Sequence, residues 1–304
     1  MTDLSIAAAP SQPAKGRSLW EDARRRLARN PAAMISLYAT AFLVLLAIFG
    51  PLLWVHQYDT IYPDRVALAP TFEHLHLLGA DTVGRDMVAR LLVGLRVSLL
   101  VGAAATLVAL TIGVAYGAIA GFAGGWLDEA MMRIVDVLYA IPFVFFVIVL
   151  MSVVQLRDPL ANLLLIFMAI GAVEWLTMAR IVRGQTLSLR RKEFVDAARA
   201  AGASPLQIVF RHIVPNVMGP VAVFATLNIP VIILTESFLS FIGLGVQEPL
   251  TSLGKLIKEG ADQMMVAPWM LVSPALAMLV TLLALNVLGD GLRDALDPNE
   301  GNRR

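Results

Sequence analysis

Long apolar runs alternate with shorter polar segments along this chain. A helix needs about 20 apolar residues to cross the roughly 30 Å hydrocarbon core of a bilayer, and each run is long enough. The runs lack the regular apolar–polar alternation of a membrane β-barrel strand, the other structure that can span lipid. We therefore predict an all-α polytopic membrane protein with six transmembrane helices, at residues 32–55, 94–120, 130–154, 161–182, 215–241 and 268–290.

Composition supports a membrane protein and excludes several other classes. The 304 residues are 58% hydrophobic and only 15% charged, whereas a soluble domain carries about 25% charged residues. A net charge of +1 gives no electrostatic reason to expect nucleic-acid binding. The chain has no cysteine, which excludes disulfides, iron–sulfur ligation and a thiol nucleophile.

The N-terminal apolar run does not resemble a cleaved signal sequence. It begins near Ala32 behind four arginines and continues to about Val55, which is too long for a signal-peptide core. We interpret it as a transmembrane helix that stays in the protein. The expected organisation is an N-terminal segment 1–31, a first span 32–55, an outer loop 56–93, a five-helix core 94–298 with a cytoplasmic loop 183–215, and a tail 299–304.

The distribution of Lys and Arg predicts that both termini are cytoplasmic. With the N-terminus inside, the majority of the 24 Lys and Arg residues fall in inner segments, as the positive-inside rule requires. Arg85, Arg90 and Arg96 lie on the wrong side of this rule, and Asp81 and Asp86 are available to neutralise part of their charge.

Three glycines in the second span recur at four-residue spacing, at Gly113, Gly117 and Gly121. Small residues at this spacing let two helix backbones approach closely in lipid. We therefore assign these glycines to helix packing and not to a pathway.

The loop between spans four and five predicts two short helices joined by a tight turn. An alanine-rich helix ends at Gly202, which suits the residue after a helix C-terminus. Ser204 suits an N-cap and Pro205 the first position of a second helix. Pro215 restricts the residue before it, so this second helix should end before Val214. The pattern alone is also typical of an ordinary solvated helical hairpin.

This loop resembles the EAA loop of permease subunits of ABC importers. The EAA pattern has an acidic residue, two alanines, a glycine four residues after the second alanine and a proline thirteen residues after the glycine. The matching residues are Asp196, Ala197, Ala198, Gly202 and Pro215. Asp196 stands where the pattern often has glutamate, which keeps the negative charge.

Other segments resemble one branch of that family, the second permease subunit of dipeptide, oligopeptide and nickel importers. The similar segments are Gly79–Asp86, Glu236–Pro249 and Asn286–Pro298, and the resemblance runs from about Ala32 to Pro298. Ala80 stands where the first of these motifs normally has threonine. Gln247–Ser252 looks closer to the oligopeptide branch than to the dipeptide branch.

The resemblance implies a type I ABC importer permease fold in a bacterial cell (inner) membrane. It implies a second homologous permease as partner, two ATP-binding subunits and an extracytoplasmic substrate-binding protein that delivers peptide. It also implies that the EAA loop couples the spans to the ATPases. The residues expected to carry this coupling are Glu193, Phe194, Asp196, Ala197, Ala198, Arg199, Gly202, Ser204, Pro205, His212 and Pro215.

The sequence contains no ATP-binding signature of its own. The phosphate-loop pattern G-x-x-x-x-G-K-[ST] does not occur, and Gly254-Lys255 is followed by Leu256. We expect no cofactor on this chain and no catalytic residue, with ATP and magnesium held by the partner ATPases.

Polar residues within the spans are candidates for the translocation path, because such groups are costly in lipid. Glu174 either lines a cavity or bonds to a neighbouring helix. Pro230, near Asn228, could bend span five. Glu236 and Ser240 share a helix face and either border an outer vestibule or form a structural cap. Arg133 and Asp136, three residues apart, predict an ion pair on one helix.

His74 and His76 form an H-x-H pair in the outer loop, with His56 nearby in sequence. These histidines either form a metal site or are ordinary surface residues. The surface interpretation is favoured because no carboxylate has suitable spacing. We therefore expect no metal site.

Two other function classes compete with a peptide importer. A permease for dipeptides, nickel, glutathione or another small solute belongs to the same family. A secondary transporter or channel would show broken-helix repeats or a mid-membrane coupling carboxylate, and Glu174 is the one mid-span candidate. The sequence does not specify the peptide's length or side chains, or the identity of the partner subunits.

Overall fold

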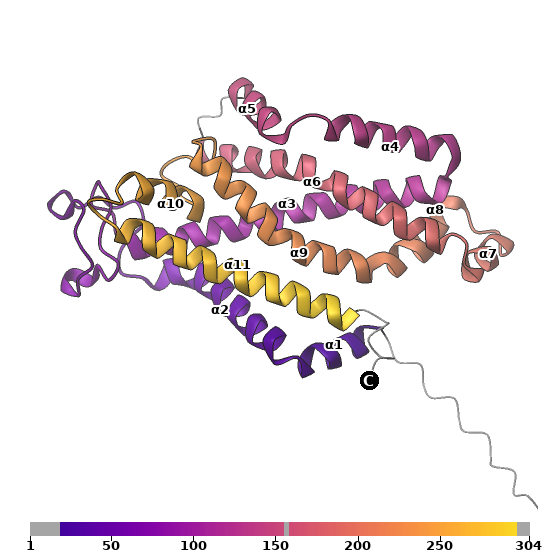
Figure 1. Ribbon diagram of the computed structural model, residues 1–304, viewed down its shortest axis with the longest axis horizontal. Coiled ribbons are helices and arrows are strands. Elements are labelled where there is room, and N and C mark those ends of the chain that lie inside the picture. Colours follow the sequence, from indigo (N-terminus) through magenta and orange to yellow (C-terminus); the bar gives the residue numbers. More distant parts are fainter. Residues whose placement is uncertain (1–18, 155–157, 297–304) are drawn as a thin grey trace, which may run out of the picture.

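Five long apolar helices form the body of the molecule in the computed structural model, which describes residues 19–154 and 158–296. Figure 1 shows an elongated bundle, with α7 at one end and the loops around α10 at the other. The helices are α1 (Leu19–Arg29), α2 (Pro31–Leu53), α3 (Met87–Ala123), α4 (Gly125–Tyr139), α5 (Phe143–Val153), α6 (Pro159–Leu189), α7 (Glu193–Ala200), α8 (Pro205–Ile208), α9 (Val214–Phe241), α10 (Leu253–Asp262) and α11 (Trp269–Leu296), with short helical turns η1 (Pro63–Arg65), η2 (Glu73–Leu75) and η3 (Val209–Ile213).

The predicted all-α membrane fold is confirmed, with one span differing from expectation. The helices α2, α3, α6, α8–α9 and α11 are each long and apolar enough to cross a membrane. The expected third span, 130–154, is instead two helices bent by 77°. Pro142 stands at the N-cap of α5, and a proline cannot continue the hydrogen-bond ladder of the helix before it.

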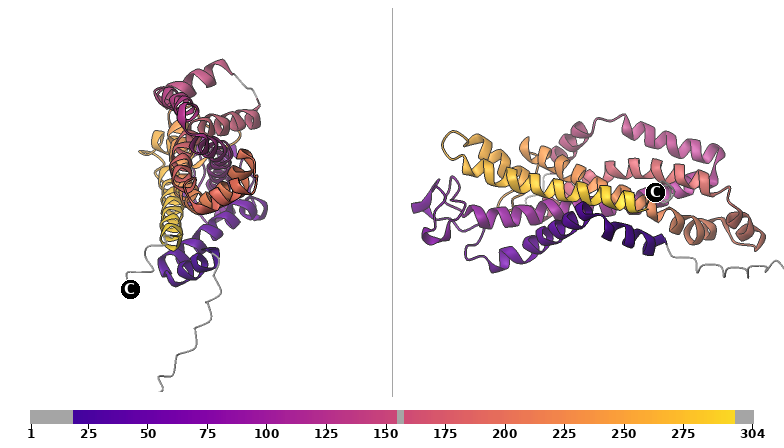
Figure 2. Two further views of the ribbon diagram at one scale, coloured as in Figure 1. Left: turned by 90° about the vertical axis from the view of Figure 1, so that its right-hand side faces the viewer. Right: turned by 60° about the horizontal axis from the view of Figure 1, so that its bottom comes forward.

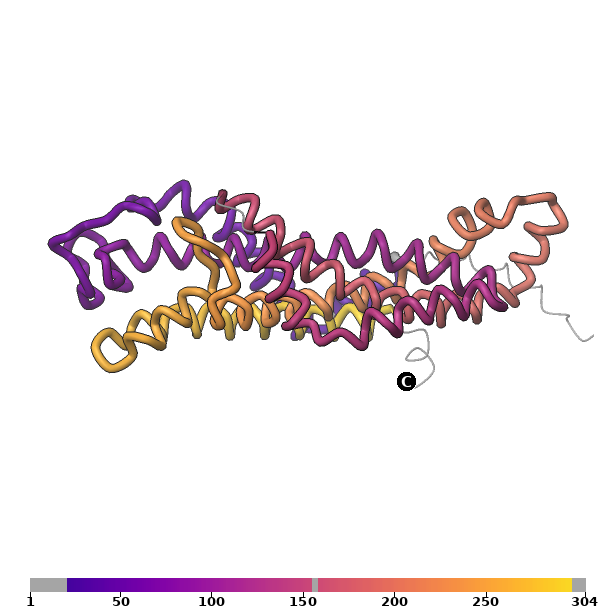
Figure 3. The backbone as a smooth tube through the Cα atoms, turned by 90° about the horizontal axis from the view of Figure 1, so that it is seen from above, coloured from indigo at the N-terminus to yellow at the C-terminus, as the bar shows by residue number. Residues whose placement is uncertain are grey.

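Two spans extend well beyond their expected ends. The helix α3 begins at Met87, not near 94, because the Asp86 side chain accepts a hydrogen bond from the Ala89 N–H at 2.8 Å and caps the helix. The helix α6 continues to Leu189, past the expected end at 182. The added residues of α3 lie at the end of the molecule opposite α7, whereas those of α6 lie at the α7 end (Figures 1 and 3).

The three spaced glycines of α3 form the close contact with α6 that the sequence predicts. A Cβ on Gly113 would lie 2.6 Å from the Cβ of Met178, and one on Gly121 would lie 2.8 Å from the carbonyl oxygen of Arg183. A Cβ on Gly117 would overlap the carbonyl oxygen of Ala179. These glycines bring the two backbones together, and the packing interpretation is confirmed.

Replacing Gly117 by alanine is expected to destabilise the bundle, because the added methyl overlaps backbone that cannot rotate away. Overpacking of this kind costs about 1–3 kcal/mol, so the melting temperature of the purified protein should fall. Gly184→Ala in α6 is the matched control, since a Cβ there meets nothing within 4 Å. It should leave the melting temperature unchanged or slightly higher. Equal melting temperatures for the two variants would contradict the contact.

A buried ion network fixes the start of α3 at the end opposite α7. The fully buried Asp81 carboxylate accepts hydrogen bonds from Arg85 Nε at 2.7 Å and from Arg90 Nη1 at 2.6 Å. Arg90 also binds Glu259 of α10 at 2.6 Å, and Arg85 binds Glu248 at 3.3 Å. This network joins the start of α3 to α10 and to the loop before α10, across separations of 163 and 169 positions in the sequence.

The groups around Asp81 favour the ionised form of its carboxyl group. Burial alone raises the pKa of its carboxyl, but the positive charge of Arg90 and hydrogen bonds from Arg85 and the Val83 N–H outweigh it, so the pKa lies below its ordinary value. Asp81 therefore neutralises Arg85 and Arg90, as expected. Asp86 does not take part, because Trp54 and His76 donate to it. Arg96 instead donates to carbonyl oxygens of α2.

The helix α1 packs against α11 beside the start of α2. Figure 2 shows α1 and the end of α11 lying close together, away from the loops around α10. Within the described residues, both ends of the chain therefore lie toward the α7 side of the molecule.

Candidate coupling site

The helix α7 ends at a turn that only a few residue types can form. Gly202 has a φ of +82°, its N–H donates to the carbonyl of Arg199 at 3.0 Å, and the Ala203 N–H donates to the carbonyl of Ala198 at 3.1 Å. These two bonds are those of a Schellman C-cap, which places glycine in the left-handed region. The predicted position of Gly202, as the residue that ends this helix, is confirmed.

A capping box starts the next helix immediately after this turn. The Ser204 side chain accepts a hydrogen bond from the Gln207 N–H, and the Gln207 side chain accepts one from the Ser204 N–H at 2.9 Å. Pro205 occupies the first turn, where its missing N–H costs nothing. The hinge at Gly202–Pro205 is therefore defined on both sides by satisfied backbone groups.

The second helix does not end before Val214, and this prediction is wrong. The turn η3 is π-helical, its last bond runs from the Val214 N–H to the carbonyl of Val209, and α9 follows without a break. The wider turn absorbs one extra residue, so Pro215 falls in the first turn of α9 and needs no donor. Residues Pro205–Phe241 consequently act as one continuous helix.

The segment from α7 to η3 (Glu193–Ile213), called the α7–η3 segment below, has one buried face and one exposed face. Val195 and Ala198 of α7 and Ile208 of α8 join a buried hydrophobic cluster with residues of α3, α6 and α9. Asp196, Ala197 and Ala200 face outward. The segment is thus anchored on the bundle and presents small and charged side chains at the molecule's tip.

Apolar side chains also stand exposed on this tip. Phe194, Leu206 and Phe210 are at least 37% exposed, with Phe210 at 51%. Arg199 pairs with Asp196 at 3.1 Å, and its guanidinium lies over the Phe122 ring at the end of α3. An exposed apolar surface on a rigid projecting segment is typical of a protein–protein contact.

The comparisons with known proteins agree with this geometry. The family described as the inner membrane component of binding-protein-dependent transport systems matches residues 113–301, more than half of the chain. The chain belongs to this family. The N-terminal transmembrane domain of oligopeptide transport permease C matches residues 18–70 of the permease.

Relatives resemble the permease over nearly its whole length. It is 50% identical to the oligopeptide transport system permease protein OppC of Haemophilus influenzae, over 94% of this chain and 90% of the relative. It is 51% identical to OppC of Escherichia coli K12, over 94% and 93%. The dipeptide transport system permease protein DppC of Bacillus subtilis is 42% identical, over 92% and 86%.

Two path candidates of the permease bond to each other across helices. Asn228 of α9 donates from Nδ2 to Glu174 Oε2 of α6 at 2.9 Å. This contact supports the second alternative for Glu174, a hydrogen bond to a neighbouring helix. Pro230 lies buried within α9, two residues beyond Asn228.

The buried Glu236 is the centre of a hydrogen-bond network near the C-terminal end of α9. Its exposed fraction is 0%. Ser240 donates to it at 2.6 Å and Ser98 of α3 at 3.4 Å, while the Ser98 hydroxyl accepts the Leu253 N–H at the start of α10. This arrangement favours the structural alternative for Glu236 and Ser240, because their polar atoms tie three helices together.

The expected ion pair between Arg133 and Asp136 is not formed. Asp136 instead accepts a hydrogen bond from Arg180 of α6 at 2.7 Å. Residues three apart on one helix are neighbours, but α6 brings a closer arginine to the carboxylate.

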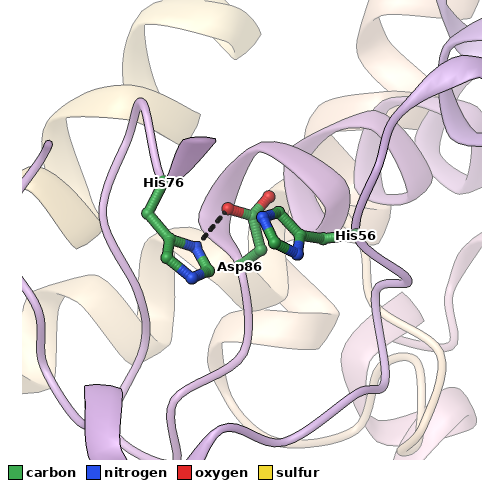
Figure 4. A group of neighbouring side chains, drawn as sticks. All are labelled: His56, His76 and Asp86. Atoms are coloured by element: carbon green, nitrogen blue, oxygen red, sulfur yellow. Dashed lines mark hydrogen bonds and ion pairs between the residues drawn. The ribbon is translucent and has the colours of Figure 1, made fainter. Parts of the chain in front are cut away.

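The outer histidines are not surface residues as a group. His74 is exposed, but His56 and His76 are buried, with their rings stacked at a centroid distance of 4.5 Å. Figure 4 shows both rings beside Asp86, the carboxylate that the sequence spacing did not reveal. The prediction that these histidines lie on the surface is therefore wrong for two of the three.

The side chains of His56, His76 and Asp86 lie close enough together to hold a metal ion. The ring nitrogens of the two histidines, however, already have hydrogen-bond partners. His76 Nε2 accepts from Arg65 at 2.9 Å, so its Nδ1 donates to Asp86 at 2.8 Å. His56 Nε2 donates to the carbonyl of His74 at 2.7 Å, and Nδ1 accepts from Tyr62 at 3.1 Å. The Arg65 charge beside the cluster also opposes a cation.

The exposed Leu206 and Phe210 were not predicted from the sequence, because neither residue belongs to the EAA pattern. Their signal was present in the sequence, because two large apolar side chains in a polar loop between spans indicate a contact surface. The pairing of Arg180 with Asp136 had no comparable signal, because the two residues lie 44 positions apart.

Proposed function

We propose that this permease is the transmembrane subunit of an ATP-driven importer for oligopeptides. It forms the translocation path together with a second homologous permease. Two ATP-binding subunits supply the energy, and an extracytoplasmic binding protein delivers the peptide. The similarity to relatives named oligopeptide permeases, at 50–51% identity, supports oligopeptide over dipeptide or glutathione as substrate.

The observation that supports coupling is the construction of the α7–η3 segment. Its buried face is continuous with α3, α6 and α9, and its second half runs directly into the transmembrane helix α9. A push on the exposed tip is therefore transmitted to a span without a flexible joint, apart from the turn at Gly202–Pro205. This is the mechanical arrangement that an ATPase docked on the tip requires.

The permease is proposed to lie in the bacterial inner membrane with both termini in the cytoplasm. The excess of Lys and Arg in the inner segments supports this orientation. The ion network around Asp81 removes part of the objection raised by Arg85 and Arg90, because their charges are paired within the fold.

Reconstitution in proteoliposomes tests the proposal. The permease is assembled with its partner permease, with or without the two ATPases, and uptake of a labelled oligopeptide presented by the binding protein is measured. We expect uptake only with the ATPases and ATP. Uptake by the permease without ATP would overturn the ABC assignment. Uptake of nickel or glutathione in place of the peptide would overturn the substrate class.

A further inference from the structure

Polar contacts and a single fully buried apolar side chain, Val135, attach the helix α4 to the bundle. None of the four buried hydrophobic clusters in the described part of the chain includes a residue of α4. Three side-chain contacts join it to α6 instead: Asp128 to Arg183, Asp136 to Arg180, and the Tyr139 hydroxyl to the Thr177 hydroxyl. Figure 1 shows α4 running along the edge of the bundle beside α6.

The two faces of α4 differ in chemistry. Asp128, Asp136 and Tyr139 share the face toward α6, whereas Ile134 and Val137 are more than half exposed on the opposite face. The seam between α4 and α6 therefore combines these polar contacts with one buried apolar side chain, Val135, whereas the outward face presents Ile134 and Val137.

Two arginines of the seam are bound in different ways. Arg183 makes two hydrogen bonds to Asp128, at 2.5 and 2.7 Å, and the Asp128 side chain is only 8% exposed. Arg180 makes a single hydrogen bond to Asp136, and the side chains of this pair are 46% and 53% exposed. Arg183 is thus held by both oxygens of Asp128, whereas Arg180 keeps N–H groups that have no partner in Asp136 and face open space.

The position of the Arg180 guanidinium is fixed without using those N–H groups. It lies over the Tyr139 ring, 4.2 Å from the centroid, in a cation–π contact that leaves its edge available. Glu174, Thr177 and Arg180 recur every three residues along α6, which makes a polar row about 9 Å long. The row runs from the Glu174–Asn228 hydrogen bond to the half-exposed ion pair.

We propose that the α4–α6 seam forms one wall of the substrate path and that Arg180 binds carboxylate groups of the passing peptide. The planar guanidinium matches a carboxylate with two parallel N–H groups. Asp136 occupies only one of them, so a substrate carboxylate can bind beside it and leave again, and weak binding of this kind suits passage. The inference rests on the proposed peptide-permease function.

The absence of cysteine from this chain allows a direct test. Thr177→Cys is introduced into the permease, the whole complex is reconstituted, and labelling of this subunit by membrane-impermeant anionic and cationic methanethiosulfonates is measured. We expect labelling that slows during peptide turnover. Adding Arg180→Gln should lower the anionic-to-cationic rate ratio about tenfold, since one unit charge acts a few ångströms away. Arg180→Lys should retain the preference for the anion.

Two controls separate this role from general effects. Val137→Cys, next to Asp136 on the apolar face, should label far more slowly than Thr177→Cys. Arg133→Gln removes one exposed positive charge from α4 and should leave the ratio at Thr177→Cys unchanged. An unchanged ratio in Arg180→Gln would overturn the carboxylate site. If peptide turnover does not slow the labelling of Thr177→Cys, the seam is not a wall of the substrate path. Equal labelling rates at Val137→Cys and Thr177→Cys would contradict the wall as well.

Uptake measured in the same vesicles keeps this test apart from the proposed function. Loss of ATP dependence in the Thr177→Cys complex would contradict the importer assignment whatever the labelling shows. ATP-driven uptake combined with an unchanged charge preference would contradict the Arg180 site alone.

Discussion

Replacing Gly202 by proline is expected to abolish ATP-driven uptake while leaving the permease inserted in the membrane. Proline holds φ near −65°, whereas Gly202 has a φ of +82° and uses its N–H in the C-cap of α7. The substitution removes this hydrogen bond and reverses the turn, at a cost of about 3 kcal/mol or more. The helix α7 would then lose its packing against the bundle. We therefore expect uptake to fall at least tenfold while the partner ATPases still hydrolyse ATP.

Gly202→Asn is the matched control for this prediction. Asparagine tolerates the left-handed region better than other residues with a side chain, it keeps the N–H, and a Cβ at this position meets nothing within 4 Å. Its uptake and ATP hydrolysis should stay close to those of the unchanged protein. Uptake coupled normally to hydrolysis in Gly202→Pro would show that the turn does not transmit the ATPase movement.

Replacing Arg90 by methionine is expected to give the largest loss of stability. Arg90 is 1% exposed and bridges Asp81 to Glu259 of α10. Its removal leaves a buried carboxylate with a single remaining cation, Arg85. Breaking a buried ion network in this way costs about 3–5 kcal/mol. The melting temperature of the purified permease should fall by roughly 10 °C, given a few degrees for each kcal/mol.

Lys258→Met measures the effect of losing an exposed pair. Lys258 binds Asp262 one turn further along α10 at 2.8 Å, with both side chains exposed. Pairs of this kind contribute at most about 1 kcal/mol, so the melting temperature should change by no more than about 2–4 °C. A similar small change in Arg90→Met would mean that the network around Asp81 does not hold the outer end of the permease together.

The order of residues was sufficient to predict the five unbroken spans and the turn at Gly202, but not the 77° bend before α5. A long apolar run indicates a helical span, because lipid offers no hydrogen-bond partner and the backbone must form its hydrogen bonds within the helix. The glycines of α3 were assigned correctly because close backbone approach in lipid has one common sequence pattern. Gly202, Ser204 and Pro205 were assigned correctly because each acts on its own backbone within four residues.

Two local rules applied to the sequence gave the wrong result. Pro215 was expected to end a helix, but a π-helical turn before it moved the proline into the first turn of α9. Arg133 was expected to pair with Asp136, but α6 brings Arg180 to that carboxylate. The first failure has a local cause, a wider helical turn, and the second has a partner on another helix.

What the residues determine locally is therefore the class of the protein, its spans and the form of the α7–η3 segment, since those depend on hydropathy, on glycine conformation and on helix caps. Only the tertiary structure decided that His56 and His76 are buried beside Asp86, that Arg90 bridges Asp81 to Glu259 of α10, and that three polar side-chain contacts join α4 to α6. These contacts join side chains from separate helices and loops, and hydrogen bonds and charges act over a few ångströms in space, whatever the distance along the chain.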